Sequence, residues 1–296
     1  MVTPPDNSSL YKSAAGYRQV MAHYDTSFQN IGVPYETKYV ETCFGPTHAV
    51  ISGNENGKSI VLWHGLNANS TMWTDWISVL APTYRLYAID TIGGMGKSAP
   101  SRSSKTGPAY GHWAADALQG LGLKQANMIG ISNGGWLILK LAGVAPQKIG
   151  SATLMSSAGF KSVSKTVILH MMPYLAFRSP AQATRRFLKL LAPPDAPPPG
   201  PGELEMFELI LTHFRFEQNP AALPDHEIRG LTAPTYLMMG QYERSFDPYA
   251  VIKRGLTLLP NLIRAEIVPG VGHGMVHRQP DWITARVIRF LESHTI

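Results

Sequence analysis

Met128-Ile-Gly-Ile-Ser-Asn-Gly-Gly-Trp136 is the stretch that decides the fold of this chain. It contains a G-x-S-x-G pattern, in which Ser132 stands between Gly130 and Gly134. An apolar run typical of a buried strand precedes the serine, and an apolar run typical of a helix follows it. This context predicts a nucleophile elbow, a sharp strand-to-helix turn that exposes the serine hydroxyl. The glycines are needed because a side chain there would collide with the tight turn or the neighbouring strand.

The composition of the 296 residues is that of a globular protein, with 44% hydrophobic and 16% charged residues. The net charge is +6, but no nucleic-acid-binding motif accompanies it, so we expect no nucleic-acid partner. The N-terminus lacks a signal-peptide pattern, and the longest apolar stretch, 166–177, is too short to span a bilayer. We therefore expect a cytoplasmic protein without stable membrane insertion. The oligomeric state stays open.

Strand-like and helix-like runs alternate along most of the chain. After a helix within residues 8–30 and two strands at 35–43 and 47–52, short buried strands alternate with helices. This alternation indicates parallel βαβ units, and hence an α/β fold with a mostly parallel central sheet flanked by helices. The expected strands are 59–63, 85–89, 126–131, 152–155, 234–239 and 265–268, and the expected helices are 72–80, 110–121, 135–144, 248–258 and 282–291.

Residues 158–229 interrupt the alternation. The first part of this region carries six Lys or Arg residues and no acid, its second part is mostly acidic, and the proline-rich run 193–201 forbids a continuous helix between them. We interpret the region as a helical cap, which divides the core into residues 1–157 and 230–296. Its basic part fits a solvated face or contact with an anionic surface.

Large apolar residues of the cap are expected to face the pocket and to favour an apolar or aromatic small-molecule substrate. The same residues would equally serve to pack the cap on the core. They are Met171, Met172, Tyr174, Leu175 and Phe177.

A serine hydroxyl needs a base that takes its proton, and the base needs a third group to orient it. Such groups are expected at the carboxyl ends of parallel strands. The strand at 234–239 runs into Glu243 and the strand at 265–268 into His273, 30 residues later, which is the length of one βαβ step. We therefore predict Ser132 as the nucleophile, His273 as the base and Glu243 as the acid.

Asp247 is the alternative acid, but it precedes Pro248 in the pattern of a helix N-cap, which gives it a structural role. Glu243 is favoured because it lies closer to the end of its strand. An oxyanion hole also needs two backbone N–H groups. We expect one from Asn133, at the start of the elbow helix, and the other from Leu66, in the loop after the strand at 59–63.

Several other polar residues are expected to be structural. His64 is interpreted as a hydrogen-bonding group and Asp90 as a carboxylate that holds its loop. Cys43, the single cysteine, excludes an intramolecular disulfide, and we expect it to be buried. His273 and His277 have the spacing of a zinc-binding helix, but the glutamate of that motif is missing, so neither a metal nor another cofactor is expected.

The motifs taken together resemble the α/β-hydrolase superfamily, and within it the capped carboxylesterases of the Bacillus naproxen-esterase type. The resemblance covers residues 35–158 and 230–293 and implies the triad named above and ester hydrolysis through an acyl-enzyme. Many relatives have Asp in place of Glu243, and either carboxylate can orient a histidine. The motifs are Phe44-Gly-Pro-Thr-His48, Trp63-His-Gly-Leu66, Asn69-Ser-Thr-Met-Trp73, Asp90 with the glycines before Ser98, Met128 to Gly135, Gly240-Gln-Tyr-Glu243 with Asp247-Pro248, and Gly270-Val-Gly-His273.

Other chemistry on the same fold remains open at this point. The alternatives are carbon–carbon bond hydrolysis, lactone hydrolysis, cofactor-free perhydrolysis, or a ligand receptor that retains a slow triad. The serine argues against epoxide or haloalkane hydrolysis, for which enzymes of similar fold use an Asp at the elbow.

Overall fold

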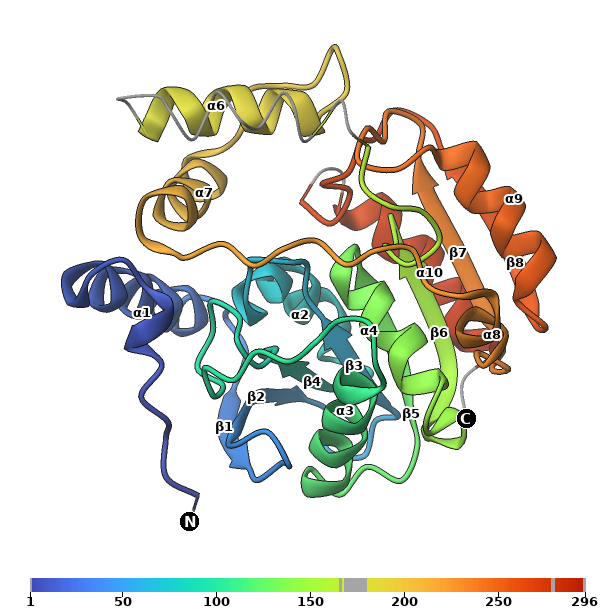
Figure 1. Ribbon diagram of the computed structural model, residues 1–296, viewed down its shortest axis with the longest axis horizontal. Helices are drawn as coiled ribbons and strands as arrows, with labels where there is room; N and C mark the ends of the chain where they lie inside the picture. The colour runs from blue at the N-terminus through green and yellow to red at the C-terminus, as the bar shows by residue number, and fades with distance from the viewer. Residues whose placement is uncertain (1, 165–166, 168–179, 278–279, 295–296) are drawn as a thin grey trace.

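An eight-stranded sheet forms the centre of the computed structural model, which describes residues 2–164, 167, 180–277 and 280–294 (Figure 1). The strand order is β1-β2-β4-β3-β5-β6-β7-β8. β2 pairs antiparallel with β1 and with β4, and every other pair is parallel. The strands are β1 (Tyr35–Val40), β2 (Thr47–Gly53), β3 (Ser59–Trp63), β4 (Arg85–Ile89), β5 (Ala126–Ile131), β6 (Ile149–Met155), β7 (Thr235–Gly240) and β8 (Leu262–Val268).

Helices cover both faces of the sheet (Figure 1). One apolar cluster joins the sheet to α3 (Ala109–Gly120), α4 (Asn133–Ala142), α8 (Asp225–Arg229) and α9 (Pro248–Leu258). A second cluster, on the other face, joins it to α1 (Ala14–Gln29), α2 (Thr74–Leu80) and α10 (Pro280–His294). Within the described residues the chain also forms three short 3₁₀ helices, Ser8–Leu10, Ser70–Trp73 and Pro146–Lys148.

The central strands are buried and largely apolar because both of their faces are covered. In β3, Ile60 and Leu62 pack into one cluster, whereas Val61 and Trp63 pack into the other. Successive side chains of a strand point to opposite faces, so a strand between two helical layers needs a continuous apolar run. This pattern explains why the predicted bounds of β3 and β4 agree with the structure. The predicted bounds of α9 agree as well. The predicted fold class is confirmed.

Cys43 differs from its prediction, because it is exposed rather than buried. It lies in the turn between β1 and β2, where its backbone N–H donates to the Asp116 carboxylate at 3.0 Å. A tight turn between strands runs over the surface, so its residues have no core to enter. The expectation of a buried cysteine is therefore wrong.

The segment between β6 and β7 carries α6 (Pro180–Leu191) and α7 (Pro201–His213), followed by α8. α6 and α7 pack against each other, and α7 also packs against α1, as Figure 1 shows. The proline-rich run separates α6 from α7, as predicted. Within the described ranges, no helix is both long and apolar enough to cross a membrane.

Candidate active site

Ser132 occupies a sharp turn between β5 and α4. Its backbone has φ 52° and ψ −112°, a conformation that residues other than glycine rarely adopt. Neighbouring segments fix it: the Ser132 N–H donates to the Met155 carbonyl at 2.9 Å, and the Ser132 carbonyl accepts from the Ala158 N–H at 3.0 Å. The serine is thus held in a strained position at the end of the sheet.

Three glycines make this turn possible. A Cβ on Gly130 would lie 2.5 Å from the Gly134 carbonyl carbon, and one on Gly134 would lie 1.9 Å from the Trp63 carbonyl oxygen. A Cβ on Gly135 would lie 2.3 Å from Ser157 Oγ. The first two neighbours are backbone atoms that cannot move aside. These distances confirm the collisions with the turn and with the neighbouring strand that the sequence predicts.

β7 and β8 bring Glu243 and His273 together at their carboxyl ends. His273 Nδ1 donates to Glu243 Oε2 at 2.7 Å, while Glu243 Oε1 accepts from the Ser245 N–H at 2.7 Å. The Glu243 side chain has no exposed surface, and that of His273 is 17% exposed. The acid and the histidine therefore meet as the 30-residue spacing predicts.

Each member of this pair changes the pKa of the other. Burial alone would raise the pKa of Glu243, but the charge and hydrogen bond of His273 bring it below its usual value. Burial alone would lower the pKa of His273, but the Glu243 carboxylate raises it above its usual value. The pair thus favours an ionised Glu243 beside an imidazole that is a stronger base than an ordinary histidine.

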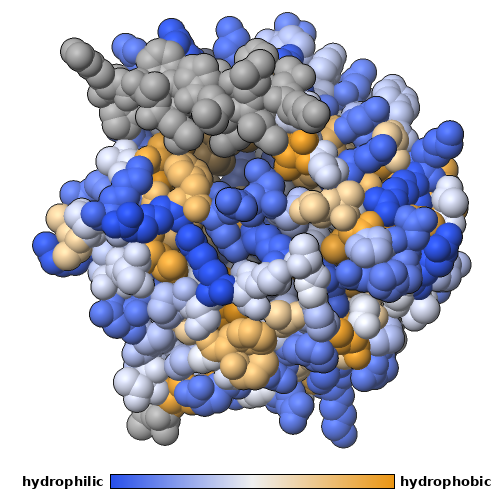
Figure 2. All heavy atoms as spheres, viewed as in Figure 1, coloured by the Kyte–Doolittle hydropathy of each residue, from blue (hydrophilic) through white to orange (hydrophobic). Residues whose placement is uncertain are grey.

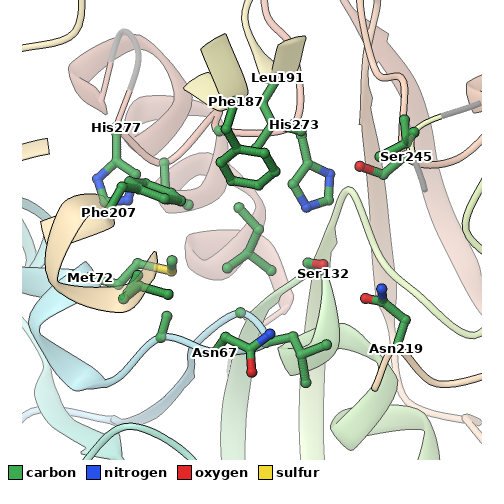
Figure 3. A pocket seen from close by; sticks show the side chains of 18 of the residues that line it. Asn67, Met72, Ser132, Phe187, Leu191, Phe207, Asn219, Ser245, His273 and His277 are labelled. Atoms are coloured by element: carbon green, nitrogen blue, oxygen red, sulfur yellow. The ribbon is translucent and has the colours of Figure 1, made fainter. Parts of the chain in front are cut away.

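Ser132 and His273 line the same cavity, of about 150 Å³. Figure 3 shows the imidazole of His273 next to Ser132, with Asn219 and Ser245 on one side of the serine. In the space-filling view of Figure 2 the surface is hollowed in its upper half, with apolar side chains on both sides of the hollow. Most of the residues that line the cavity around Ser132 are apolar, so a reactive serine hydroxyl would work in a mostly apolar recess.

The two predicted oxyanion donors lie on segments that flank the serine. Asn133 is the first residue of α4, where backbone N–H groups lack partners within the helix and the helix dipole favours negative charge. Leu66 lines the cavity in the loop after β3. A Cβ on Gly65 would lie 4.0 Å from Ser132 Cβ, so this loop closely approaches the serine.

His64 and Asp90 have the structural roles that were predicted. His64 Nε2 accepts from the Thr91 N–H at 3.0 Å and its Nδ1 lies 2.8 Å from the Gly65 carbonyl, so the ring is a neutral bridge between two loops. Burial lowers the pKa of His64, in keeping with that neutral form. The fully buried Asp90 carboxylate accepts from Ser70 N–H, Lys97 N–H and the Tyr24 hydroxyl at 2.9, 2.9 and 3.0 Å, and from His48 Nδ1 at 3.0 Å.

Asp247, the alternative acid, caps α9. Its Oδ1 accepts from the Ala250 N–H at 3.1 Å, and Pro248 occupies the first helical position. These contacts are those of the predicted N-cap. The carboxylate that contacts His273 is that of Glu243.

The walls of the cavity come partly from α6 and α7. The predicted cap residues Met171, Met172, Tyr174, Leu175 and Phe177 lie outside the described residues. A second set of apolar residues, which was not predicted, also lines the cavity. These residues recur at the four-residue spacing of a helix face, a signal from which they could have been found. They are Phe187 and Leu191 on α6, and Met206, Phe207 and Ile210 on α7.

Polar groups in the cavity were also missed. Asn67, Asn219, Ser245 and His277 line it (Figure 3), and they come from four separate segments, so no local motif marks them. Among the residues that the structure describes, no three His, Cys, Asp or Glu side chains gather in a way that could hold a metal ion.

Known proteins share this architecture. Residues 58–200 match the family model described as the alpha/beta hydrolase fold. The chain is also 30% identical over 280 residues to carboxylesterase YbfK of Bacillus subtilis, across 90% of this chain and 92% of that protein. The chain belongs to the α/β-hydrolase family.

Two further relatives of this α/β hydrolase confirm the resemblance that the motifs indicate. An uncharacterized carboxylesterase, nap, of Bacillus subtilis is 29% identical over 282 residues, which cover 92% of each chain. Among solved structures, naproxen esterase (carboxylesterase NP) from Bacillus subtilis matches with a TM-score of 0.83 and 26% identity, over 95% of this chain and 99% of that one. The similarity therefore extends over most of the length of these relatives.

Proposed function

We propose that this α/β hydrolase is a carboxylesterase that cleaves small-molecule carboxylic esters through an acyl-enzyme formed on Ser132. The observation that carries the proposal is the 2.7 Å contact between Glu243 and His273, in a cavity that His273 shares with Ser132. The relatives named carboxylesterases support the same reaction class.

In the first half of the proposed reaction, Ser132 Oγ attacks the ester carbonyl carbon. His273 takes the serine proton at Nε2 and delivers it to the departing alcohol oxygen, while Glu243 holds the Nδ1–H and stabilises the imidazolium. The N–H groups of Leu66 and Asn133 stabilise the negative oxygen of the tetrahedral intermediate. In the second half, water replaces the alcohol, and the same groups release the carboxylic acid.

The chemistry of the cavity wall supports an apolar substrate. Phe187, Met206, Phe207 and Ile210 contribute mainly carbon surface to the α6–α7 side of the cavity. Burial of an apolar acyl or alkyl group there would yield about 25 cal/mol per Å² of surface removed from water. We therefore propose esters with an apolar or aromatic group as the preferred class.

The test is turnover of p-nitrophenyl esters of increasing acyl length by the wild-type enzyme and by Ser132→Ala. We expect kcat/KM to rise with acyl length until the cavity is filled, and to fall by about 10³-fold or more in the variant. Ser104, an exposed serine that is not among the residues lining the cavity, gives the matched control, and Ser104→Ala should retain wild-type activity. Turnover by Ser132→Ala equal to that of the wild-type enzyme would refute the proposal. If the wild-type protein binds the esters but does not turn them over, a receptor would be favoured instead.

A further inference from the structure

Asn67 directly follows Leu66, the proposed oxyanion donor, and has an unusual backbone. Its φ is 56°, in the left-handed region, which asparagine adopts more often than other residues with a side chain. Such a conformation persists when surrounding contacts determine it. Whatever holds Asn67 therefore also holds the loop that carries the Leu66 N–H.

The Asn67 side chain is hydrogen-bonded to the backbone of Glu217, 150 positions away. Its Oδ1 accepts from the Glu217 N–H at 2.8 Å, and its Nδ2 donates to the Glu217 carbonyl at 3.5 Å. One amide thus engages both backbone groups of Glu217. Figure 3 shows Asn67 on the floor of the cavity, below Ser132.

Glu217 is itself fixed by its carboxylate. Its Oε1 accepts from the Tyr110 hydroxyl at 2.9 Å and lies 3.1 Å from Lys105 Nζ. The Glu217 side chain is only 10% exposed. Tyr110 belongs to α3, and its ring lies against that of Trp136 in the elbow helix, with 5.3 Å between centroids. The carboxylate therefore anchors Glu217 to the core rather than to solvent.

The chain on either side of Glu217 is also tied to the core. We call residues 214–219, which follow α7, the strap. Arg102 Nη2 donates to the Arg215 carbonyl at 2.7 Å, and Lys105 Nζ donates to the Gln218 carbonyl. Phe216 and Asn219 of the strap line the cavity. The strap is thus a fixed part of the cavity wall. Its residue Glu217 is hydrogen-bonded through its backbone to Asn67, in the loop that carries the Leu66 N–H.

We propose that Glu217 is a positioning residue for the oxyanion hole. Tyr110 and Lys105 hold its carboxylate, its backbone holds the Asn67 amide, and Asn67 keeps the Leu66 N–H directed at the reacting oxygen. This inference rests on the proposed function, because it takes Leu66 to donate to an oxyanion.

Removal of the Glu217 carboxylate should lower kcat more than it raises KM, because an oxyanion exists only after the serine attacks. We expect Glu217→Ala to lower kcat by about 10- to 100-fold, a part of the 10²- to 10³-fold effect of a lost donor, with KM changed by less than about threefold. Glu217→Gln retains an oxygen that can accept from Tyr110, so it should recover most of the activity.

Asn67→Gly tests the same link from its other end. Glycine tolerates the positive φ but lacks the amide, so kcat should again fall by about 10- to 100-fold. Because both changes break one contact, the double variant should be little slower than the slower single variant. If Glu217→Ala folds poorly, the two single variants Asn67→Gly and Glu217→Gln still test the inference. The first should lower kcat, and the second should retain most of it. Gln218→Ala, the neighbouring strap position, is the matched control and should keep the wild-type kcat.

A trifluoromethyl ketone supplies a readout that a merely structural role would not move. Its adduct with Ser132 carries an oxyanion, so its affinity should fall in parallel with kcat/KM, whereas the affinity of the carboxylic acid product should not. An unchanged kcat, an effect on KM alone, or an unchanged ketone affinity in an active enzyme would overturn the inference but leave the proposed function intact. Absence of ester turnover by the wild-type enzyme would refute the proposed function, and this inference with it.

Discussion

The carbonyl oxygen of Leu191, the last residue of α6, accepts a hydrogen bond from the His273 backbone N–H at 3.1 Å. The last carbonyls of a helix have no partner within it, so this contact satisfies one of them. It also joins α6, which lies between β6 and β7 in the chain, directly to the proposed catalytic base. A Cβ on the adjacent Gly272 would lie 2.2 Å from the same oxygen.

Gly272→Ala should therefore separate α6 from the His273 loop. The added methyl group collides with a backbone oxygen, so either the helix end or the histidine must shift. Because a small displacement of a catalytic group is costly, we expect kcat/KM to fall by about tenfold or more. Gly274→Ala is a close control, since a Cβ there meets no atom within 4 Å. Equal activities of the two variants would show that the α6 contact does not position His273.

Glu243→Gln and Asp247→Asn together test which carboxylate acts with His273. The first change replaces the buried partner of Nδ1 by an amide and should lower kcat by about 10³- to 10⁴-fold. The second should keep activity within about threefold and leave the melting temperature nearly unchanged, since Asn caps a helix as well as Asp. Loss of activity in Asp247→Asn alone would reverse the assignment.

The pH dependence of kcat/KM should report the Glu243–His273 pair. His273 acts as a base only when neutral, and its pKa lies above the usual value of 6.5. Activity should therefore fall as the pH drops through an inflection above 6.5, by up to tenfold per pH unit. In Glu243→Gln the cause of the raised pKa is gone and burial alone acts, so the inflection of the residual activity should move to lower pH. An acid limb at the same pH in both proteins would contradict the assignment.

Asp90 should matter for stability rather than for the reaction. Burial alone would raise its pKa, but the hydrogen bond and charge of His48, with the other donors, bring it below 3.8. A carboxylate with a lowered pKa stabilises the fold above its unfolded pKa, and that stability is lost as the pH falls through the folded pKa. Asp90→Asn should lower the free energy of unfolding at pH 7 by about 3–5 kcal/mol in urea titrations.

Asp25→Asn is the matched control for that change. Asp25 pairs with the Lys97 side chain at an exposed site, whereas Asp90 accepts from the Lys97 backbone. A surface pair contributes about 0–1 kcal/mol, so this variant should remain close to wild type. The advantage of wild type over Asp90→Asn should narrow as the pH decreases toward the pKa of Asp90. A similar loss in both variants would refute the special role of the buried carboxylate.

The parts of the site that were predictable are those with a local signature. Ser132 stands in a strand–turn–helix pattern, and Glu243 and His273 each follow one of two adjacent parallel strands, so their meeting depends only on regular parallel topology. Similarly, the position of Asp247 directly before a proline predicts the start of α9. In these cases the physical cause acts within about ten residues, and a single sequence displays it.

The parts that escaped prediction depend on distant partners. Nothing near Asn67 or Glu217 in the sequence marks a contact across 150 positions. Cys43 was placed wrongly because the general preference of cysteine for the interior does not account for a surface turn. The apolar spacing on α7 indicates a buried face, but it does not distinguish packing on α1 from lining a cavity.

The packing of α1 on α7 has a consequence for synthesis of the protein. Next to α1, the chain around Tyr11 bridges Phe214, with hydrogen bonds between Lys12 and His213 and between Arg215 and Leu10. The two residues of this bridge, Tyr11 and Phe214, are 203 positions apart. At about 5–20 residues per second, the early partner leaves the ribosome roughly 10–40 s before the late one. During that interval its apolar side chains, Leu10 and Tyr11 among them, lack the surface that later covers them, so this stretch stays exposed to solvent until nearly three quarters of the chain has been made.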